Sequence, residues 1–189
     1  WGHVRPCCWA LRYVGDIHNQ DVGDIWNGSR YQDFRRHMLS GDLDGYCPSD
    51  CPNLTQSSVE WRTYIGQMLR HPSKNHVVNL SEIIQGAATL RSTPIQIKVT
   101  PTLACNLDCI MCYQVHDPGP QLPAKVIADL LALSRRAQLL RVQGGEIFAS
   151  KRGMNFLEQL AGVVPQPAIA IITNGTFPIA NAWTLLERL

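Results

Sequence analysis

The pattern of apolar and polar positions changes character near residue 94. From there to residue 189, short apolar runs of strand type alternate with stretches whose apolar residues recur at helical spacing. This repeated strand-helix order predicts a parallel sheet whose strands are joined by right-handed crossovers. The predicted strands are residues 95–99, 139–142 and 168–172, and the predicted helices follow Pro123, carry Phe156 to Ala161 and carry Ile179 to Leu186.

The segment before residue 94 differs in composition and in the spacing of its apolar residues. Residues 1–54 are rich in Gly, Asp, Asn, Cys and Pro, which predicts loops and one helix near Ser29–Leu39. This segment has too little apolar content for a large core, so we expect a metal or cluster to contribute to its folding. Residues 55–93 look like a helical linker, with a capping box at Ser57 and Glu60 and a short helix over Ser81–Leu90.

Composition excludes several classes of protein. Hydrophobic residues make up 45% and charged residues 17%, as in a globular protein, and the net charge of +2 is too small for a nucleic-acid binder. No apolar run approaches the roughly 20 residues of a membrane span, and no signal-type apolar core follows the start. We expect a cytoplasmic protein without a nucleic-acid or membrane partner. Trp1 in first place and an unterminated helical pattern before Leu189 suggest a longer protein.

The seven cysteines fall into two groups. Clustered cysteines without a secretion signal indicate metal or cluster ligands in a reducing compartment, and a disulfide framework is the less favoured alternative. The first group is Cys7, Cys8, Cys47 and Cys51, and the second is Cys105, Cys109 and Cys112.

The second group has the spacing C-x3-C-x2-C directly after a predicted strand. Three thiolates from one loop would leave one coordination position of a soft metal or cluster open. A structural zinc site completed by His116 is the alternative. Gly144-Gly145-Glu146 and Thr173-Asn174-Gly175-Thr176 end the other two predicted strands, and sites in α/β proteins gather at such ends. We therefore expect the three motifs to converge.

The cysteine spacing, Tyr113 after the last cysteine and the later Gly-Gly-Glu together resemble the radical S-adenosylmethionine (SAM) superfamily. The resemblance runs from about residue 95 to the end. It implies an α/β fold made of about three βα units, the first half of a parallel (β/α)6 partial TIM barrel. Ile147-Phe148 stands where many relatives have Pro, so we expect a different local turn without loss of SAM binding.

The resemblance also implies roles for particular residues. Cys105, Cys109 and Cys112 would bind three irons of a [4Fe–4S] cluster, whose fourth iron takes the amino and carboxylate groups of SAM. Tyr113 would pack near the adenine, and Asn174 would lie near the ribose or methionine part. Gly144 and Gly145 would let backbone approach the methionine amino group, and Glu146 could supply a carboxylate for that cation.

The reaction that the resemblance implies is reductive cleavage of SAM to methionine and a 5′-deoxyadenosyl radical, which abstracts hydrogen from a substrate. The electron would come from a reductant such as ferredoxin or flavodoxin. We expect these units alone to lack the substrate contacts that later barrel strands supply.

The motif elements of the amino-terminal segment are Gly2, Pro6-Cys7-Cys8, Gly15-Asp16-Ile17, Asp24 to Gly28, a helix with Arg35, Gly41, and Cys47-x3-Cys51-Pro52. This pattern resembles SPASM or twitch domains, which carry auxiliary iron–sulfur clusters in radical SAM enzymes. The resemblance implies an auxiliary iron–sulfur cluster held by Cys47, Cys51 and one of Cys7 and Cys8, with zinc as the alternative. Because enzymes with this module often modify peptides or proteins, the unknown substrate would belong to that class.

The domains expected are 1–54 (Cys-rich module), 55–93 (helical linker) and 94–189 (radical SAM core). The rival hypothesis is a non-catalytic zinc-binding or interaction module.

Overall fold

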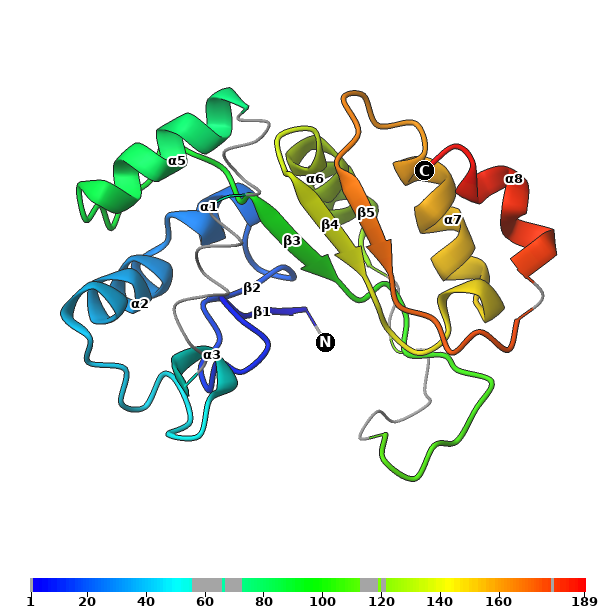
Figure 1. The fold of residues 1–189 in the computed structure, drawn as a ribbon, viewed down its shortest axis with the longest axis horizontal. Helices are drawn as coiled ribbons and strands as arrows, with labels where there is room; N and C mark the ends of the chain where they lie inside the picture. The colour runs from blue at the N-terminus through cyan, green and yellow to red at the C-terminus, as the bar shows by residue number, and fades with distance from the viewer. Residues whose placement is uncertain (1, 56–65, 67–72, 113–118, 120–121, 178) are drawn as a thin grey trace. The chain divides into compact units, whose positions relative to one another are not determined.

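A computed structural model describes residues 2–55, 66, 73–112, 119, 122–177 and 179–189. The chain forms two compact units, Gly2–Thr93 and Pro94–Leu189, drawn in Figure 1. Each unit has its own hydrophobic core. The three-part division expected from the sequence remains a prediction, since the proposed capping box at Ser57 and Glu60 lies outside the described residues.

The carboxy-terminal unit is a mixed α/β structure around a parallel three-stranded sheet, as the alternating pattern predicts. Strands β3 (Gln96–Val99), β4 (Leu139–Val142) and β5 (Ala168–Ile171) pair in the order β3-β4-β5, all parallel. Each strand is followed by a helix, which confirms the predicted alternation. These helices are α6 (Ala124–Ser134), α7 (Lys151–Leu160) and α8 (Trp183–Leu186), with 3-10 turns at η1 (Ile147–Ala149) and η2 (Ile179–Ala182).

The core of this unit lies on one face of the sheet. Leu140 and Val142 on β4 are fully buried, and α7 contributes Leu157 and Leu160, also fully buried. On β5, Ala168 is exposed and the other three residues are partly buried. All apolar strand residues of the core point to the same side because side chains alternate along a strand. The core residues from the strands are Ile97, Val99, Leu140, Val142, Ile169 and Ile171.

At the end of the chain the apolar pattern is only partly right. We expected one helix over Ile179 to Leu186, but the structure divides this segment, and the Trp183 side chain is 57% exposed. Leu185 takes the buried position instead, because α8 begins only at Trp183 after the separate turn η2. A 3-10 turn advances with three residues per turn, so it shifts the buried face relative to a continuous α-helix.

The amino-terminal unit is built from short elements. Helix α2 confirms the helix predicted over Ser29–Leu39, and it ends at Gly41, whose φ of 76° lies in the left-handed region that glycine allows. The pair β1 and β2 is antiparallel. The elements are β1 (His3–Val4), β2 (Gly15–Asp16), α1 (Val22–Trp26), α2 (Ser29–Ser40), α3 (Pro52–Thr55) and α5 (Lys74–Ile84).

The helix expected over Ser81–Leu90 was placed wrongly. Helix α5 begins at Lys74 and ends at Ile84. Ser73 caps its start: the hydroxyl accepts from the backbone N–H of His76, and the His76 ring accepts from the backbone N–H of Ser73. This is a capping box with histidine in place of the usual Glu or Gln, so the sequence rule missed it.

Arg35 lies at the centre of the amino-terminal unit, where only 8% of its surface is exposed. Its guanidinium donates to the carbonyls of Trp26 (2.7 Å) and Ala88 (2.9 Å) and stacks over the rings of Trp26 and Tyr31, each 4.4 Å away. Burial lowers the pKa of Arg35. This side chain organises a unit whose apolar core is small, namely Val14, Ile25, Phe34 and Tyr46.

A second polar anchor joins α5 to the segment that follows it. Glu82 is 3% exposed and accepts hydrogen bonds from the backbone N–H groups of Arg91 (2.5 Å) and Ser92 (3.2 Å) and from the Ser92 hydroxyl (2.6 Å). Burial alone would raise the pKa of Glu82, but these hydrogen bonds outweigh it and lower the pKa.

Across the described ranges no helix has the length and apolar character needed to cross a membrane.

Candidate functional site

The segment that leads to the second cysteine group is fixed at the carboxyl edge of the parallel sheet. Beyond β3 the chain continues beside the strand end of β4 and forms three further backbone hydrogen bonds with it. They run from Gln143 N to Val99 O (3.0 Å), from Gly145 N to Thr102 O (3.1 Å) and from Glu146 N to Ala104 O (2.8 Å). The base of the cysteine loop is therefore tied to the Gly-Gly-Glu motif.

The two glycines of that motif are required by this close approach. A Cβ at Gly144 would overlap the carbonyl oxygen of Thr102, and a Cβ at Gly145 would overlap that of Ala104. We expected these glycines to admit a ligand. The structure gives another reason for them, because the backbone that approaches is that of the cysteine segment itself. Their contact with SAM stays a prediction.

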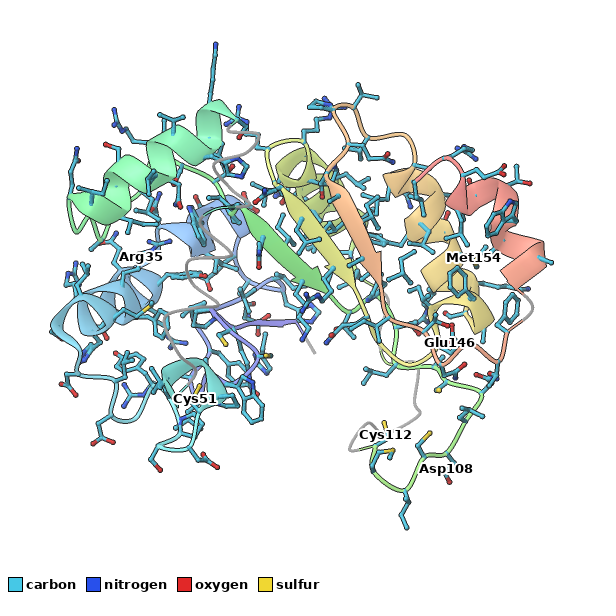
Figure 2. All side chains as sticks on the ribbon, viewed as in Figure 1. Arg35, Cys51, Asp108, Cys112, Glu146 and Met154 are labelled. Carbon is cyan, nitrogen blue, oxygen red and sulfur yellow. The ribbon has the colours of Figure 1, made fainter. Side chains whose placement is uncertain are left out.

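Glu146 joins the ends of β4 and β5. Its side chain is fully buried, Oε1 accepts from Phe148 N (3.1 Å), and Oε2 accepts from Thr173 Oγ1 (2.8 Å) and Asn174 N (2.7 Å). Figure 2 shows Glu146 at this edge of the sheet. Both carboxylate oxygens are thus used within the protein, and the predicted contact of Glu146 with a ligand cation remains untested. Ile147 is fully buried at the start of η1.

Asn174 connects the end of β5 to the cysteine loop. Its Nδ2 lies 3.8 Å from Cys105 Sγ and 3.1 Å from Asn106 Oδ1, as a donor to both. Its Oδ1 accepts from Thr176 N (3.0 Å) and Thr176 Oγ1 (2.7 Å). The predicted convergence is therefore confirmed for Cys105, Glu146 and Asn174. Thr173 and Thr176, which belong to the same predicted motif as Asn174, take part in this network, and so does Asn106, to which sequence analysis assigned no role.

Cys109 and Cys112 lie away from this network. Both are exposed on the loop that extends from the sheet, where Figure 2 labels Cys112 and Asp108, and a backbone hydrogen bond from Cys112 N to Cys109 O (2.8 Å) makes a turn. Ile110 between them is fully exposed at 103%. No group of three metal-binding side chains stands close enough to hold an ion within the described residues. Tyr113 and His116 fall outside those residues.

The donor set of this loop nevertheless fits a soft metal centre. Cys105, Cys109 and Cys112 offer three sulfur ligands within one short segment, and iron–sulfur clusters and zinc are bound by such thiolates. Cys105 Sγ also accepts from Leu107 N at 3.5 Å. Hydrogen bonds to a ligand sulfur orient it and tune the potential of a bound cluster.

In the amino-terminal unit the structure separates Cys8 from the other three cysteines. Cys51 is buried, Cys7 and Cys47 are partly buried, and Cys8 is exposed. Burial raises the pKa of the Cys47 thiol, and the neighbouring Cys51 and Cys7 add to this effect, with a hydrogen bond between Cys47 and Cys51. The three thiols are thus neighbours, although as they stand they do not surround one centre. All seven cysteines are free thiols in this structure.

Tyr31 lies beside this group. Burial is the main reason that the pKa of Tyr31 rises to about 12, and Cys7 contributes to the rise while Arg35 opposes it. The phenol is therefore protonated at neutral pH and can serve as a hydrogen-bond donor.

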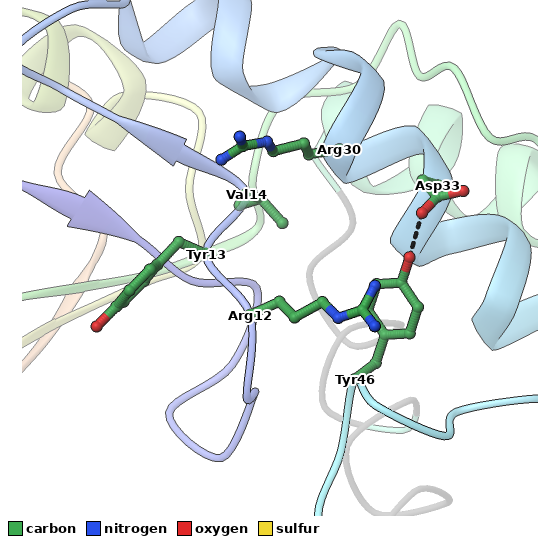
Figure 3. A pocket seen from close by; sticks show the side chains of 6 residues that line it. All are labelled: Arg12, Tyr13, Val14, Arg30, Asp33 and Tyr46. Atoms are coloured by element: carbon green, nitrogen blue, oxygen red, sulfur yellow. Dashed lines mark hydrogen bonds between the residues drawn. The ribbon is translucent and has the colours of Figure 1, made fainter.

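A pocket of about 380 Å³ opens next to the residue before Cys47 (Figure 3). The Arg12 guanidinium lies 4.5 Å from the centre of the Tyr46 ring, and the Tyr46 hydroxyl donates to Asp33. That hydrogen bond is the main reason that the pKa of Tyr46 is raised. None of the residues predicted as ligands lines the pocket. The lining residues are Arg12, Tyr13, Val14, Arg30, Asp33 and Tyr46.

The solved structure found to resemble the chain is the crystal structure of Streptococcus suis SuiB bound to precursor peptide SuiA. The two share 18% sequence identity with a TM-score of 0.40, over 83% of this chain and 34% of the SuiB chain. The chain thus spans about a third of the length of that protein. No curated protein sequence matches the chain. The amino-terminal resemblance is confirmed by a family model: residues 1–52 match SPASM, the iron–sulfur cluster-binding domain.

Proposed function

We propose that the chain forms part of a radical SAM enzyme that carries an auxiliary iron–sulfur module. The observation that carries the proposal is the network at the sheet edge. There Asn174 contacts Cys105 with its side chain and Glu146 with its backbone, so motifs from three strand ends meet at one place. The SPASM match of residues 1–52 supports it independently, because it indicates an iron–sulfur protein.

In this proposal Cys105, Cys109 and Cys112 hold a [4Fe–4S] cluster, and SAM occupies the position that three thiolates leave open. When bound, the cluster supplies the electron that cleaves SAM and so generates the radical that abstracts hydrogen from substrate. The chain's own residues position the ligands. Glu146 and Asn174 fix the loop at Cys105, while Gly144 and Gly145 let the cysteine segment lie against β4.

The sheet of the carboxy-terminal unit would be the first half of a (β/α)6 partial barrel, with later strands completing the substrate site. The substrate proposed is a peptide or protein, in keeping with the SPASM module, and the reductant is a ferredoxin or flavodoxin. Such a reductant and free thiols fit a cytoplasmic location.

Anaerobic reconstitution with iron and sulfide tests the proposal. We expect about four irons per cluster, broad absorption near ~400 nm and reductive cleavage of SAM to methionine and 5′-deoxyadenosine. Cys109→Ala should abolish SAM cleavage, whereas Ile110→Ala, a change at the adjacent exposed residue of the same loop, should retain it. Full cleavage by Cys109→Ala would refute the ligand assignment.

The alternative function is a non-catalytic zinc-binding or interaction module with a Cys3His site that includes His116. It is favoured only by the donor set, since zinc also accepts three thiolates and an imidazole. A colourless protein that takes up zinc but no iron, and that leaves SAM intact, would establish this alternative over the first.

For the auxiliary cluster we propose Cys7, Cys47 and Cys51 as ligands, with Cys8 outside the set. The neighbours that perturb Cys47 are Cys7 and Cys51, and Cys8 is not among them. Cys7→Ala and Cys8→Ala form a matched pair of adjacent substitutions. We expect the first to lose the auxiliary cluster, seen as lower iron content, and the second to keep it. The opposite result would assign Cys8 instead.

A further inference from the structure

Two cations stand side by side on the face of the parallel sheet that the core helices do not use. Lys98 on β3 pairs in register with Arg141 on β4. Both side chains are exposed, while the strand residues before and after them belong to the core on the other face. Neighbouring strands lie about 4.8 Å apart, so the two side chains rise from adjacent points of one surface.

Neither cation has a partner among the described residues: no hydrogen bond or ion pair involves the side chain of Lys98 or Arg141. Like charges directly opposite each other on neighbouring strands are unfavourable. Two other cations of this unit are paired, Lys125 with Asp129 at 3.0 Å and Arg188 with Glu158 at 3.1 Å. The Lys98–Arg141 pair therefore concentrates positive charge without compensation at this place.

The pair is flanked by a small residue and lies near the candidate site. The next residue in the same row is Ala170 on β5, which places a small side chain beside Arg141. Arg141 comes three residues before Gly144, which limits their separation to about 10 Å along an extended strand. The pair thus lies just below the sheet edge at which the cysteine segment and the strand ends converge.

We propose that Lys98 and Arg141 together bind a carboxylate of the substrate. The inference rests on the proposed function and narrows its substrate class to acidic peptides, with an Asp, Glu or terminal carboxylate held beneath the reacting centre. The planar guanidinium of Arg141 offers two parallel N–H donors to a carboxylate, and Lys98 adds a point charge. A neutral substrate would leave both cations unpaired, so the pair selects for negative charge.

Titration calorimetry of the reconstituted protein with hexaglutamate and hexaglutamine peptides tests this proposal. We expect hexaglutamate to bind, and hexaglutamine to bind much more weakly. Lys98→Met and Arg141→Met should each weaken hexaglutamate binding roughly tenfold, and Arg141→Lys should restore part of it. The matched control is Arg135→Met, which removes one exposed cation at the end of α6 and should change nothing. Thermal unfolding of each variant verifies that it is folded.

Lys98 and Arg141 could instead bind the carboxylate of SAM. The KM for SAM in the cleavage assay distinguishes this ligand from a carboxylate of the peptide substrate. We expect that KM to be unchanged in Lys98→Met and Arg141→Met. A raised KM for SAM with unchanged hexaglutamate binding would overturn the inference, as would equal binding of hexaglutamate by all variants. Failure of the wild-type protein to cleave SAM would count against the proposed function alone, because peptide binding is measured separately.

Discussion

Glu146→Gln tests whether the buried carboxylate holds the ends of β4 and β5 together. The carboxylate accepts from two backbone N–H groups, those of Phe148 and Asn174, through different oxygens. A glutamine has one oxygen and one NH2 group, so in either orientation one of these N–H groups faces another donor. Leaving one buried N–H unsatisfied costs about 1–3 kcal/mol. For a unit of this size, each kcal/mol lowers Tm by about 4–8 °C.

Urea and thermal unfolding of the purified protein measure this loss. Glu158→Gln is the control, because Glu158 pairs with Arg188 at the surface, where its side chain is 51% exposed. An exposed pair of this kind contributes about 0–1 kcal/mol. If Glu146→Gln destabilises the protein no more than Glu158→Gln does, the carboxylate is not the anchor that its three hydrogen bonds indicate. We also expect Glu146→Gln to lower the rate of SAM cleavage, since Asn174 would lose its fixed place beside Cys105.

Three further predictions concern other anchors of the two units. Gly145→Ala should displace the cysteine segment, since its Cβ would overlap that backbone, and so lower the iron content after reconstitution. Arg35→Lys should destabilise the amino-terminal unit by about 2–3 kcal/mol in urea unfolding, because a lysine keeps the charge but loses the fork of donors and the stacking. Because hydrogen bonds lower the pKa of Glu82, its stabilising effect is complete above its unfolded pKa of about 4.3 and is lost as pH falls through the lower folded pKa. Glu82→Gln should therefore lose less stability than the wild type between about pH 6 and pH 3.

Each of these predictions has a matched control. Gly162→Ala adds a methyl where the nearest atom is 3.4 Å away, and should keep the iron. Arg36→Lys changes the exposed neighbour of Arg35 and should leave unfolding unchanged. Asp44→Asn removes an exposed carboxylate and should keep the wild-type acid dependence. An equal effect of a control and its test variant would contradict the corresponding reasoning.

The parallel sheet could be predicted from the sequence because its apolar runs are short, strongly patterned and each followed by a helical stretch. Leu139–Val142 was predicted with the bounds that β4 has. Two errors have local causes. His76 closes the capping box of α5 with its ring, so the rule based on Glu or Gln missed that start. The pattern over Ile179 to Leu186 predicted one continuous helix, whereas η2 and α8 are separate.

Within the candidate site, the sequence predicted which motifs meet but not how they are joined. Spacing and strand order suffice to bring Cys105, Glu146 and Asn174 to one edge, since the ends of parallel strands share that edge. The orientation of a buried carboxylate could not be predicted in this way, because it depends on which hydrogen-bond donors of other segments lie close to it. For Glu146 these are backbone and hydroxyl groups of β5's end, and no local pattern specifies them.

The same contrast separates the buried base of the site from its exposed loop. Thr102 and Glu146 are fully buried, and backbone hydrogen bonds at these residues anchor the segment that leads to Cys105. Cys109 and Cys112 lie beyond these anchors, exposed and joined to each other by a single backbone hydrogen bond. Ligand thiols must lose protons and gather around a metal, so binding supplies the free energy that arranges such a loop. The protein thus fixes one ligand by packing and leaves the other two to be arranged by the cluster that we propose they bind.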